Sequence, residues 1–148
     1  GIGTERTNPV PAGSTILTDD GLGITVVSVD ADAWPEIQAE NYFNDLPKSG
    51  ARFLIIRLEI KNVSGGSVQK DLDVYNFKLV GSSAVLYSSG CGVVPDKLDV
   101  ALSEGEEMSG NVCFEVGDDE TDFELKYKLS YEDRNYWLHV GSGADKPE

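Results

Sequence analysis

The chain has 148 residues, of which 40% are hydrophobic and 26% are charged. This length suits one domain with its own core, and the composition is that of a folded protein rather than a disordered chain. The net charge of −14 disfavours nucleic acids and anionic membrane surfaces as partners, and it favours cationic ones, including divalent ions. No apolar run approaches the roughly 18 residues that a membrane-spanning helix needs.

The two ends of the chain differ in composition from its middle. Residues 1–13 contain two prolines and three glycines, which is typical of a flexible leader or tether. Residues 142–148 are expected to form a disordered tail, which leaves residues 14–141 for the domain. The chain starts at Gly1 without an export segment, so we expect either a cytosolic protein or a mature fragment whose signal peptide has been removed.

Between these ends, apolar residues recur at every second position, as in half-buried β-strands. In residues 53–61, Leu54, Ile56 and Leu58 fall on one face, with Arg57 and Glu59 on the other. Strands of the same kind are predicted at residues 14–18, 22–29, 75–79, 84–87, 108–116, 123–131 and 136–140. Seven or eight strands without a long helix predict an all-β fold, an immunoglobulin-like antiparallel β-sandwich.

The two cysteines, Cys91 and Cys113, can be interpreted in two ways. In an exported protein the default is a disulfide, which would stabilise the fold by roughly 3 kcal/mol, whereas in a cytosolic protein they would be buried free thiols. Cys113 is out of phase with Val112 and Phe114, which belong to the predicted core face. We therefore expect Cys113 to point away from the core and to attach the loop that carries Cys91 to the outer face of a sheet.

The connection from residue 30 to residue 50 is long for a compact domain, and residues 35–40 could form one helical turn. It carries three aromatic residues: Trp34, Tyr42 and Phe43. These could form an interaction loop for a partner, or they could fold back and plug an open end of the sandwich. We expect the plug, because exposed aromatic side chains are costly unless a partner covers them.

Several turns carry closely spaced carboxylates, which makes calcium the metal to consider, since it takes six to eight oxygen ligands from loops. The best candidate set is Asp118, Asp119, Glu120 and Asp122, followed by Asp30 and Asp32. Neither set matches the EF-hand loop pattern. The alternative is that these residues cap turns, in which Asp side chains bond local backbone amides.

The sequence offers little for catalysis. Its one histidine, His139, lies in the last predicted strand, out of phase with the core face. A serine hydrolase needs a histidine next to its nucleophile, and no Gly-x-Ser-x-Gly motif is present. We therefore expect no catalytic residue and no cofactor, and a protein that is not an enzyme.

Four stretches of the chain resemble a known family, at residues 7–13, 40–47, 91–95 and 105–116. Together they are similar to the immunoglobulin-like domain of unknown function of bacterial secreted lipoproteins, a type related to the mycobacterial secreted immunogenic antigen. The resemblance spans about residues 7–140. It implies an extracellular or cell-surface protein, often anchored through a lipidated cysteine that this chain lacks, and it carries over no ligand or catalytic residue.

The function expected first is therefore a binding or protein-interaction module, with an unidentified protein partner at the bacterial cell surface. A structural spacer domain is the second possibility, and a calcium or small-ligand carrier is the third. No nucleic acid partner is expected, and contact with the membrane is expected only through a lipid anchor.

Overall fold

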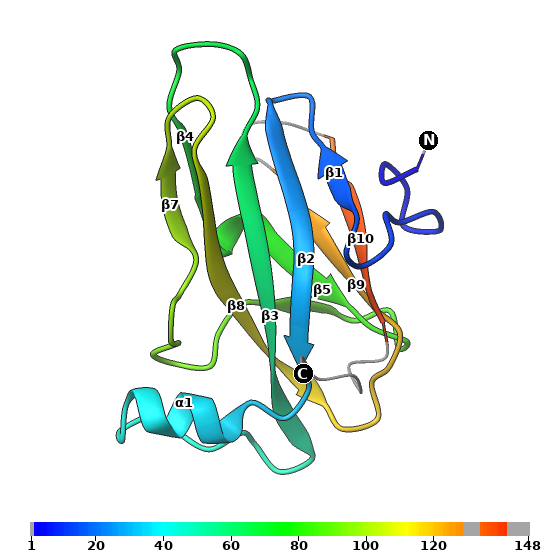
Figure 1. The fold of residues 1–148 in the computed structure, drawn as a ribbon. Coiled ribbons are helices and arrows are strands. Elements are labelled where there is room, and N and C mark those ends of the chain that lie inside the picture. The colour runs from blue at the N-terminus through cyan, green and yellow to red at the C-terminus, as the bar shows by residue number, and fades with distance from the viewer. Residues whose placement is uncertain (1, 129–133, 142–148) are drawn as a thin grey trace.

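The computed structural model describes residues 2–128 and 134–141, and its regular secondary structure is mostly β-strand (Figure 1). The helical elements in this part of the chain are α1 (Trp34–Glu40) and a short 3₁₀ turn (Val74–Asn76). The strands within the described residues are β1 (Thr15–Leu17), β2 (Leu22–Asp30), β3 (Ala51–Asn62), β4 (Lys70–Asp73), β5 (Phe77–Val80), β6 (Leu86–Ser88), β7 (Asp99–Leu102), β8 (Glu107–Gly117), β9 (Phe123–Tyr127) and β10 (Tyr136–Gly141).

Two four-stranded sheets form the body of the molecule, with strand orders β1-β2-β3-β8 and β10-β9-β5-β6. A two-stranded ribbon of β4 and β7 accompanies them, and all the paired strands run antiparallel. The predicted antiparallel sandwich is thus confirmed, although seven or eight strands was too low a number. The prediction missed β4 and β7, which carry aspartates that are more typical of turns than of strands.

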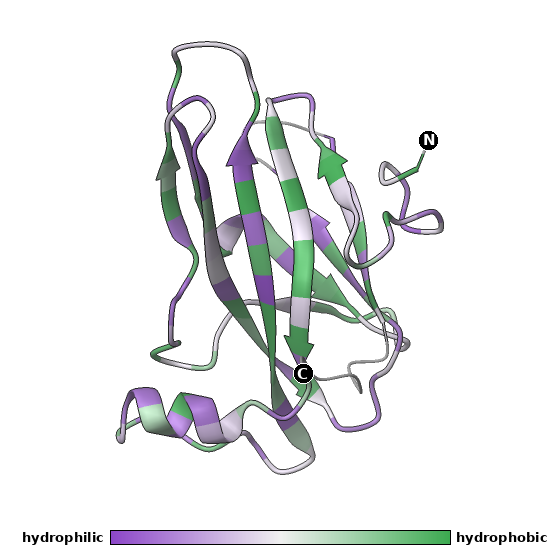
Figure 2. Ribbon diagram, in the orientation of Figure 1, coloured by the Kyte–Doolittle hydropathy of each residue, from purple (hydrophilic) through white to green (hydrophobic). Residues whose placement is uncertain are grey.

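The core lies between the two sheets, and alternation along the strands places its side chains there. Figure 2 shows hydrophilic and hydrophobic residues alternating along β3, as expected for a strand with one face in the core. The bulkiest fully buried side chains are Tyr127, Phe77, Phe114 and Phe123, and the rings of Phe77 and Tyr127 lie 5.3 Å apart. This packing holds the strands in register and fixes what each outer face presents.

The segment expected to be a flexible leader is bonded to the edge of the second sheet. Trp137 N donates to Gly3 O (2.7 Å), Val10 N to Trp137 O (2.9 Å) and His139 N to Val10 O (2.7 Å). Val10 is buried and pairs with β10 in a parallel bridge. Residues 3–10 therefore cover one side of β10. The predicted tail at residues 142–148 lies outside the described residues.

Within the described residues, the structure contains no helix with the length and apolar character that a membrane crossing requires.

Candidate interaction site

The long connection between β2 and β3 folds against the outside of the first sheet, with α1 across one end of it (Figure 1). Pro35 occupies the first turn of α1, where the missing N–H costs nothing, and Ile37 is the buried residue of the helix. The helix ends at Asn41, whose backbone is extended. We call residues 41–46, at the end of this helix, the tip.

A second, smaller apolar cluster anchors this connection, separate from the main core. Cys113 lies in it at 1% exposure, on the outer face of β8. The cluster consists of Ala33, Ile37, Phe53, Ile55, Val94 and Cys113, with Trp34 and Cys91 packed against it. Cys113 is bonded to Cys91, with Cα atoms 5.9 Å apart, so both the disulfide and its predicted outward direction are confirmed. The bond attaches residues 91–95 to the sheet beneath α1.

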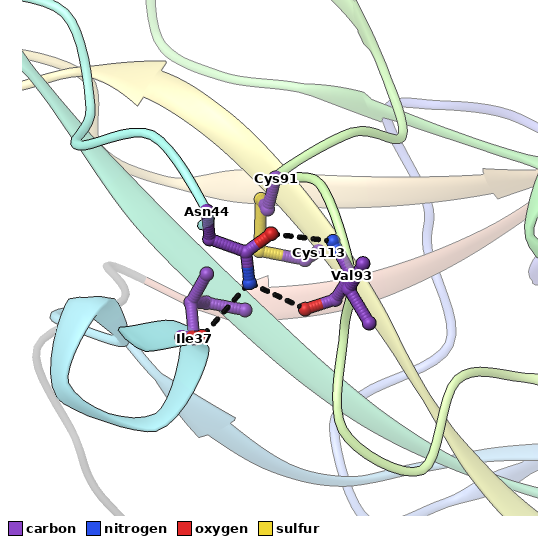
Figure 3. Close-up of a disulfide and its surroundings, with 5 residues drawn as sticks. All are labelled: Ile37, Asn44, Cys91, Val93 and Cys113. Atoms are coloured by element: carbon purple, nitrogen blue, oxygen red, sulfur yellow. Dashed lines mark hydrogen bonds between the residues drawn. A yellow bond between two sulfur atoms is a disulfide. The ribbon is translucent and has the colours of Figure 1, made fainter. Parts of the chain in front are cut away.

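Asn44 joins the tip to the disulfide segment through two hydrogen bonds and to α1 through a third (Figure 3). Its Nδ2 donates to Ile37 O and to Val93 O, each at 2.8 Å, and its Oδ1 accepts from Val93 N at 2.8 Å. Gly92 makes this approach possible, since it has φ +74° and a Cβ there would collide with Asn44 Oδ1. The tip is therefore fixed at both α1 and the disulfide.

The three aromatic residues of the connection take two different positions. Trp34 packs against the small cluster, with its ring 6.1 Å from that of Phe53, as the plug interpretation predicts. Tyr42 and Phe43 do not fold back, and they are 89% and 94% exposed. For these two residues the plug expectation is wrong, because α1 ends at Asn41 and the Asn41 Oδ1 accepts a hydrogen bond from Phe43 N, which turns the chain outward.

Two aliphatic side chains of this region are exposed together with Tyr42 and Phe43. Leu46, three residues beyond Phe43, is 67% exposed, and Val93 on the neighbouring segment is 50% exposed. Covering apolar groups that are exposed to water with another apolar surface lowers the free energy of the system, so such groups favour binding. The sequence identified Tyr42 and Phe43 as candidates, but it gave no sign that Asn44 would hold them in place.

The four acidic residues proposed for calcium are not gathered into one site. Asp118, Asp119 and Asp122 are exposed, whereas Glu120 is 5% exposed. In residues 2–128 and 134–141, no group of three or more acidic, histidine or cysteine side chains is arranged to hold a metal ion. Calcium binding stays a prediction, and a calorimetric titration with calcium tests it.

Glu120 turns inward and accepts four hydrogen bonds through its carboxylate. Oε1 accepts from Ser83 N (2.8 Å) and Ser82 Oγ (3.2 Å), and Oε2 accepts from Tyr87 Oη (2.6 Å) and Ser83 Oγ (2.7 Å). Burial acts to raise the pKa of Glu120, but the bonds from Tyr87, Ser83 and Ser82 outweigh it, so the pKa is lowered overall. The carboxylate joins the β8–β9 turn to the turn between β5 and β6.

His139 lies on the outer face of the second sheet, half-buried, and directly opposite Glu124 in β9. Burial raises the pKa of Glu124, an effect that the charges of Arg6 and His139 oppose. In the described part of the chain, no hydrogen bond joins a serine or cysteine side chain to His139. The arrangement gives no sign of the nucleophile and base that acyl transfer requires.

Solved structures similar to this one come from bacterial proteins. A candidate lipoprotein, ycdA of Bacillus subtilis, matches with a TM-score of 0.65 at 17% identity over 91% of this chain. This chain spans only 40% of the length of ycdA. The secreted protein MPT63 of Mycobacterium tuberculosis matches with a TM-score of 0.60 at 14% identity, over 90% of this chain and 97% of its own.

A third structure, yjhA of Bacillus subtilis, matches with a TM-score of 0.58 at 14% identity, over 88% of this chain and 98% of its own. At these identities the likeness shows a shared fold. No curated protein matches the sequence. The model of one family matches residues 15–136, and the chain therefore belongs to that family, the domain of unknown function DUF4352.

Proposed function

We propose that this domain is a non-enzymatic, extracytoplasmic binding module that contacts a protein partner through its tip. The observation that carries the proposal is the exposure of Tyr42 and Phe43, at 89% and 94%, on a segment that a disulfide and three hydrogen bonds hold in place. Rigid aromatic side chains lose little conformational entropy on binding, and they are enriched among residues that dominate interface energetics.

Two observations support a location outside the cytoplasm. A disulfide persists in oxidising compartments and is rare in the cytosol of most organisms. Two proteins of the same fold are described as a candidate lipoprotein and as a secreted protein. A cell-surface position would give the tip access to proteins of the envelope, which are the partners that we propose.

Replacing Tyr42 and Phe43 with serine is expected to weaken partner capture at least about tenfold, because the two side chains supply the apolar contact area. The free energy of unfolding should change by less than about 0.5 kcal/mol, since both side chains are exposed in the free protein. The measurement is capture of cell-envelope proteins by the immobilised domain, quantified by mass spectrometry, together with thermal unfolding of each variant.

A matched control is Leu17→Ser/Val68→Ser, which removes two exposed apolar side chains (68% and 64% exposed) outside the tip. This variant should capture the same proteins as the wild type. Trp34→Ala should lower the free energy of unfolding by about 2 kcal/mol, because Trp34 packs on Phe53. Capture that survives the change at Tyr42 and Phe43 unaltered would contradict the proposed role of the tip, whereas a wild type that captures no protein specifically would favour a spacer domain.

A further inference from the structure

A cleft lies beside the tip on the outer face of the first sheet. It has a volume of about 280 Å³, and its lining includes Ile55 of β3, which is 4% exposed. α1 contributes Glu36 to the lining and the disulfide segment contributes Pro95. Both of these segments also reach the tip, because α1 leads into it and Val93 is bonded to Asn44. The cleft and the tip are therefore neighbours on one surface.

Three carboxylates and one cation line this cleft. The acidic residues are Asp30, Glu36 and Asp96, and the basic residue is Arg57. Arg57 Nη1 lies 3.7 Å from Asp96 Oδ2 and donates a hydrogen bond to Asn111 Oδ1 at 3.3 Å. Asp96 thus balances the charge of Arg57, and with Asp30 and Glu36 the three negative charges and one positive charge give the cleft a net charge of −2.

The segment that carries the tip has a charge of the same sign. Residues 30–50 contain five acidic residues and one basic residue, which gives −4 over 21 residues against −14 over 148 for the whole chain, a density about twice the average. The acidic residues are Asp30, Asp32, Glu36, Glu40 and Asp45, and the basic one is Lys48. An apolar tip in acidic surroundings attracts a partner that is both apolar and cationic.

The shape of the cleft suits a long cationic side chain better than a compact ion. Its carboxylates do not converge on one point, since in residues 2–128 and 134–141 no group of three or more acidic, histidine or cysteine side chains is arranged to hold a metal. The volume is just below the roughly 300–1,000 Å³ of pockets for drug-sized ligands. An inserted side chain would lay its alkyl stem against Ile55 and Pro95, with its charged head among the carboxylates.

We propose that the protein partner of the tip inserts an arginine side chain into this cleft, beside an apolar side chain that covers Tyr42 and Phe43. A guanidinium presents a planar fork of donors that binds carboxylates in pairs of hydrogen bonds and stacks on aromatic rings, whereas the lysine ammonium has no such fork. Arginine is also enriched in protein interfaces, from which lysine is depleted. The inference rests on the proposed function and adds the chemistry of the partner.

Two other occupants fit this surface less well. A second copy of the chain would bring its own net charge of −14 toward the same carboxylates, and like charges across an interface are costly. A bilayer could cover Tyr42 and Phe43, but an anionic headgroup region would repel Glu40 and Asp45, which are exposed beside them. A protein surface that carries an arginine next to an apolar group matches both the tip and the cleft.

The test is selection from a library of random peptides displayed on phage, with the full chain immobilised at about 0.15 M salt. Peptides selected by the wild type should be enriched in arginine within a few positions of an aromatic or aliphatic residue. Asp30→Asn/Glu36→Gln should lose the arginine enrichment and keep the apolar one. The amide at position 30 keeps an oxygen that can accept the hydrogen bond from Asp32 N, so the fold should be preserved.

The matched control is Glu5→Gln/Asp71→Asn, which makes the same change in net charge, from −14 to −12, at exposed carboxylates outside this surface. It should select the same peptides as the wild type. The affinity of the best peptide, measured by calorimetry, should fall about tenfold for Asp30→Asn/Glu36→Gln, and equally when the arginine of the peptide is replaced by glutamine. Glu36→Gln alone, at an exposed position of α1, keeps the test available if the double variant unfolds.

Equal arginine enrichment by the wild type and Asp30→Asn/Glu36→Gln would overturn the proposal. So would a selection without arginine, or one that enriches lysine as strongly. Self-association in sedimentation, or binding to phosphatidylcholine vesicles, would overturn it too if Tyr42→Ser/Phe43→Ser abolished either one, because the tip would then have another occupant. Apolar enrichment that only Tyr42→Ser/Phe43→Ser removes would support the tip without the cleft, so the two proposals can fail separately.

Discussion

Replacing Cys91 and Cys113 together with alanine is expected to lower the free energy of unfolding by about 3 kcal/mol. The bond closes a loop between residues 22 positions apart, and its removal returns that conformational entropy to the unfolded chain. For a chain of this length the loss corresponds to a melting temperature about 10 °C lower. Calorimetry of the variant, and of the wild type with and without a reductant, measures it.

Loss of the disulfide should also release the tip before the rest of the molecule unfolds. Val93 exchanges hydrogen bonds with Asn44, and the segment that carries Val93 is attached to β8 through Cys91. Without the bond, we expect amide exchange at residues 41–46 and 91–95 to become faster than the loss of global stability explains. Exchange in β3 should increase only as much as that loss predicts. Hydrogen-exchange mass spectrometry resolves these segments.

The control for this effect is a variant that is destabilised elsewhere by a similar amount. Leu138→Ala removes a fully buried side chain of β10, which should cost about 3 kcal/mol and leave the tip attached. If exchange at the tip rises equally in both variants, the disulfide has no local role there. An unchanged melting temperature after reduction would contradict the stabilising role as well.

The fold was predictable because its information is local. Leu54, Ile56, Leu58 and Ile60 recur at every second position, and that period alone places one face of β3 in the core. The outward direction of Cys113 followed from its phase against Val112 and Phe114. The strands β4 and β7 were missed, since Asp71, Asp73 and Asp99 are residues that strands disfavour and that turns favour.

The sites were less predictable, because they depend on pairing between distant segments. The sequence places Asp30 and Glu36 in the long connection, but only the fold brings Asp96 to the same cleft. In the sequence nothing distinguishes Asn44 from other loop residues, because its hydrogen bonds depend on Val93, which only the fold brings next to it. The three aromatic residues of the long connection were identified as one set, and the end of α1 separates the partly buried Trp34 from the exposed pair.

Replacing Glu120 with glutamine is expected to lower the free energy of unfolding by about 2–4 kcal/mol. The buried carboxylate accepts four hydrogen bonds, and a glutamine would turn an N–H₂ group toward some of the same donors, which leaves them without an acceptor. Urea unfolding measures the loss.

The matched control is Asp119→Asn, which removes the same charge from the exposed neighbouring residue and should change stability by less than about 0.5 kcal/mol. Tyr87→Phe removes one of the four donors and should cost about 1–2 kcal/mol. A double-mutant cycle of Glu120→Gln with Tyr87→Phe then isolates their coupling. Equal effects of Asp119→Asn and Glu120→Gln would show that net charge matters and that the bonded carboxylate does not.

The pH dependence separates the charge of Glu120 from its shape. Because the pKa of Glu120 is lowered in the folded state, its contribution is fully present above the unfolded value of about 4.5 and is lost as the pH falls through the lower folded value. The wild type should therefore lose more stability than Glu120→Gln between about pH 5 and pH 3, and the two unfolding curves should converge. Parallel curves over this range would mean that the pKa of Glu120 is the same in the folded and unfolded states, and the proposed role of its charge would then be wrong.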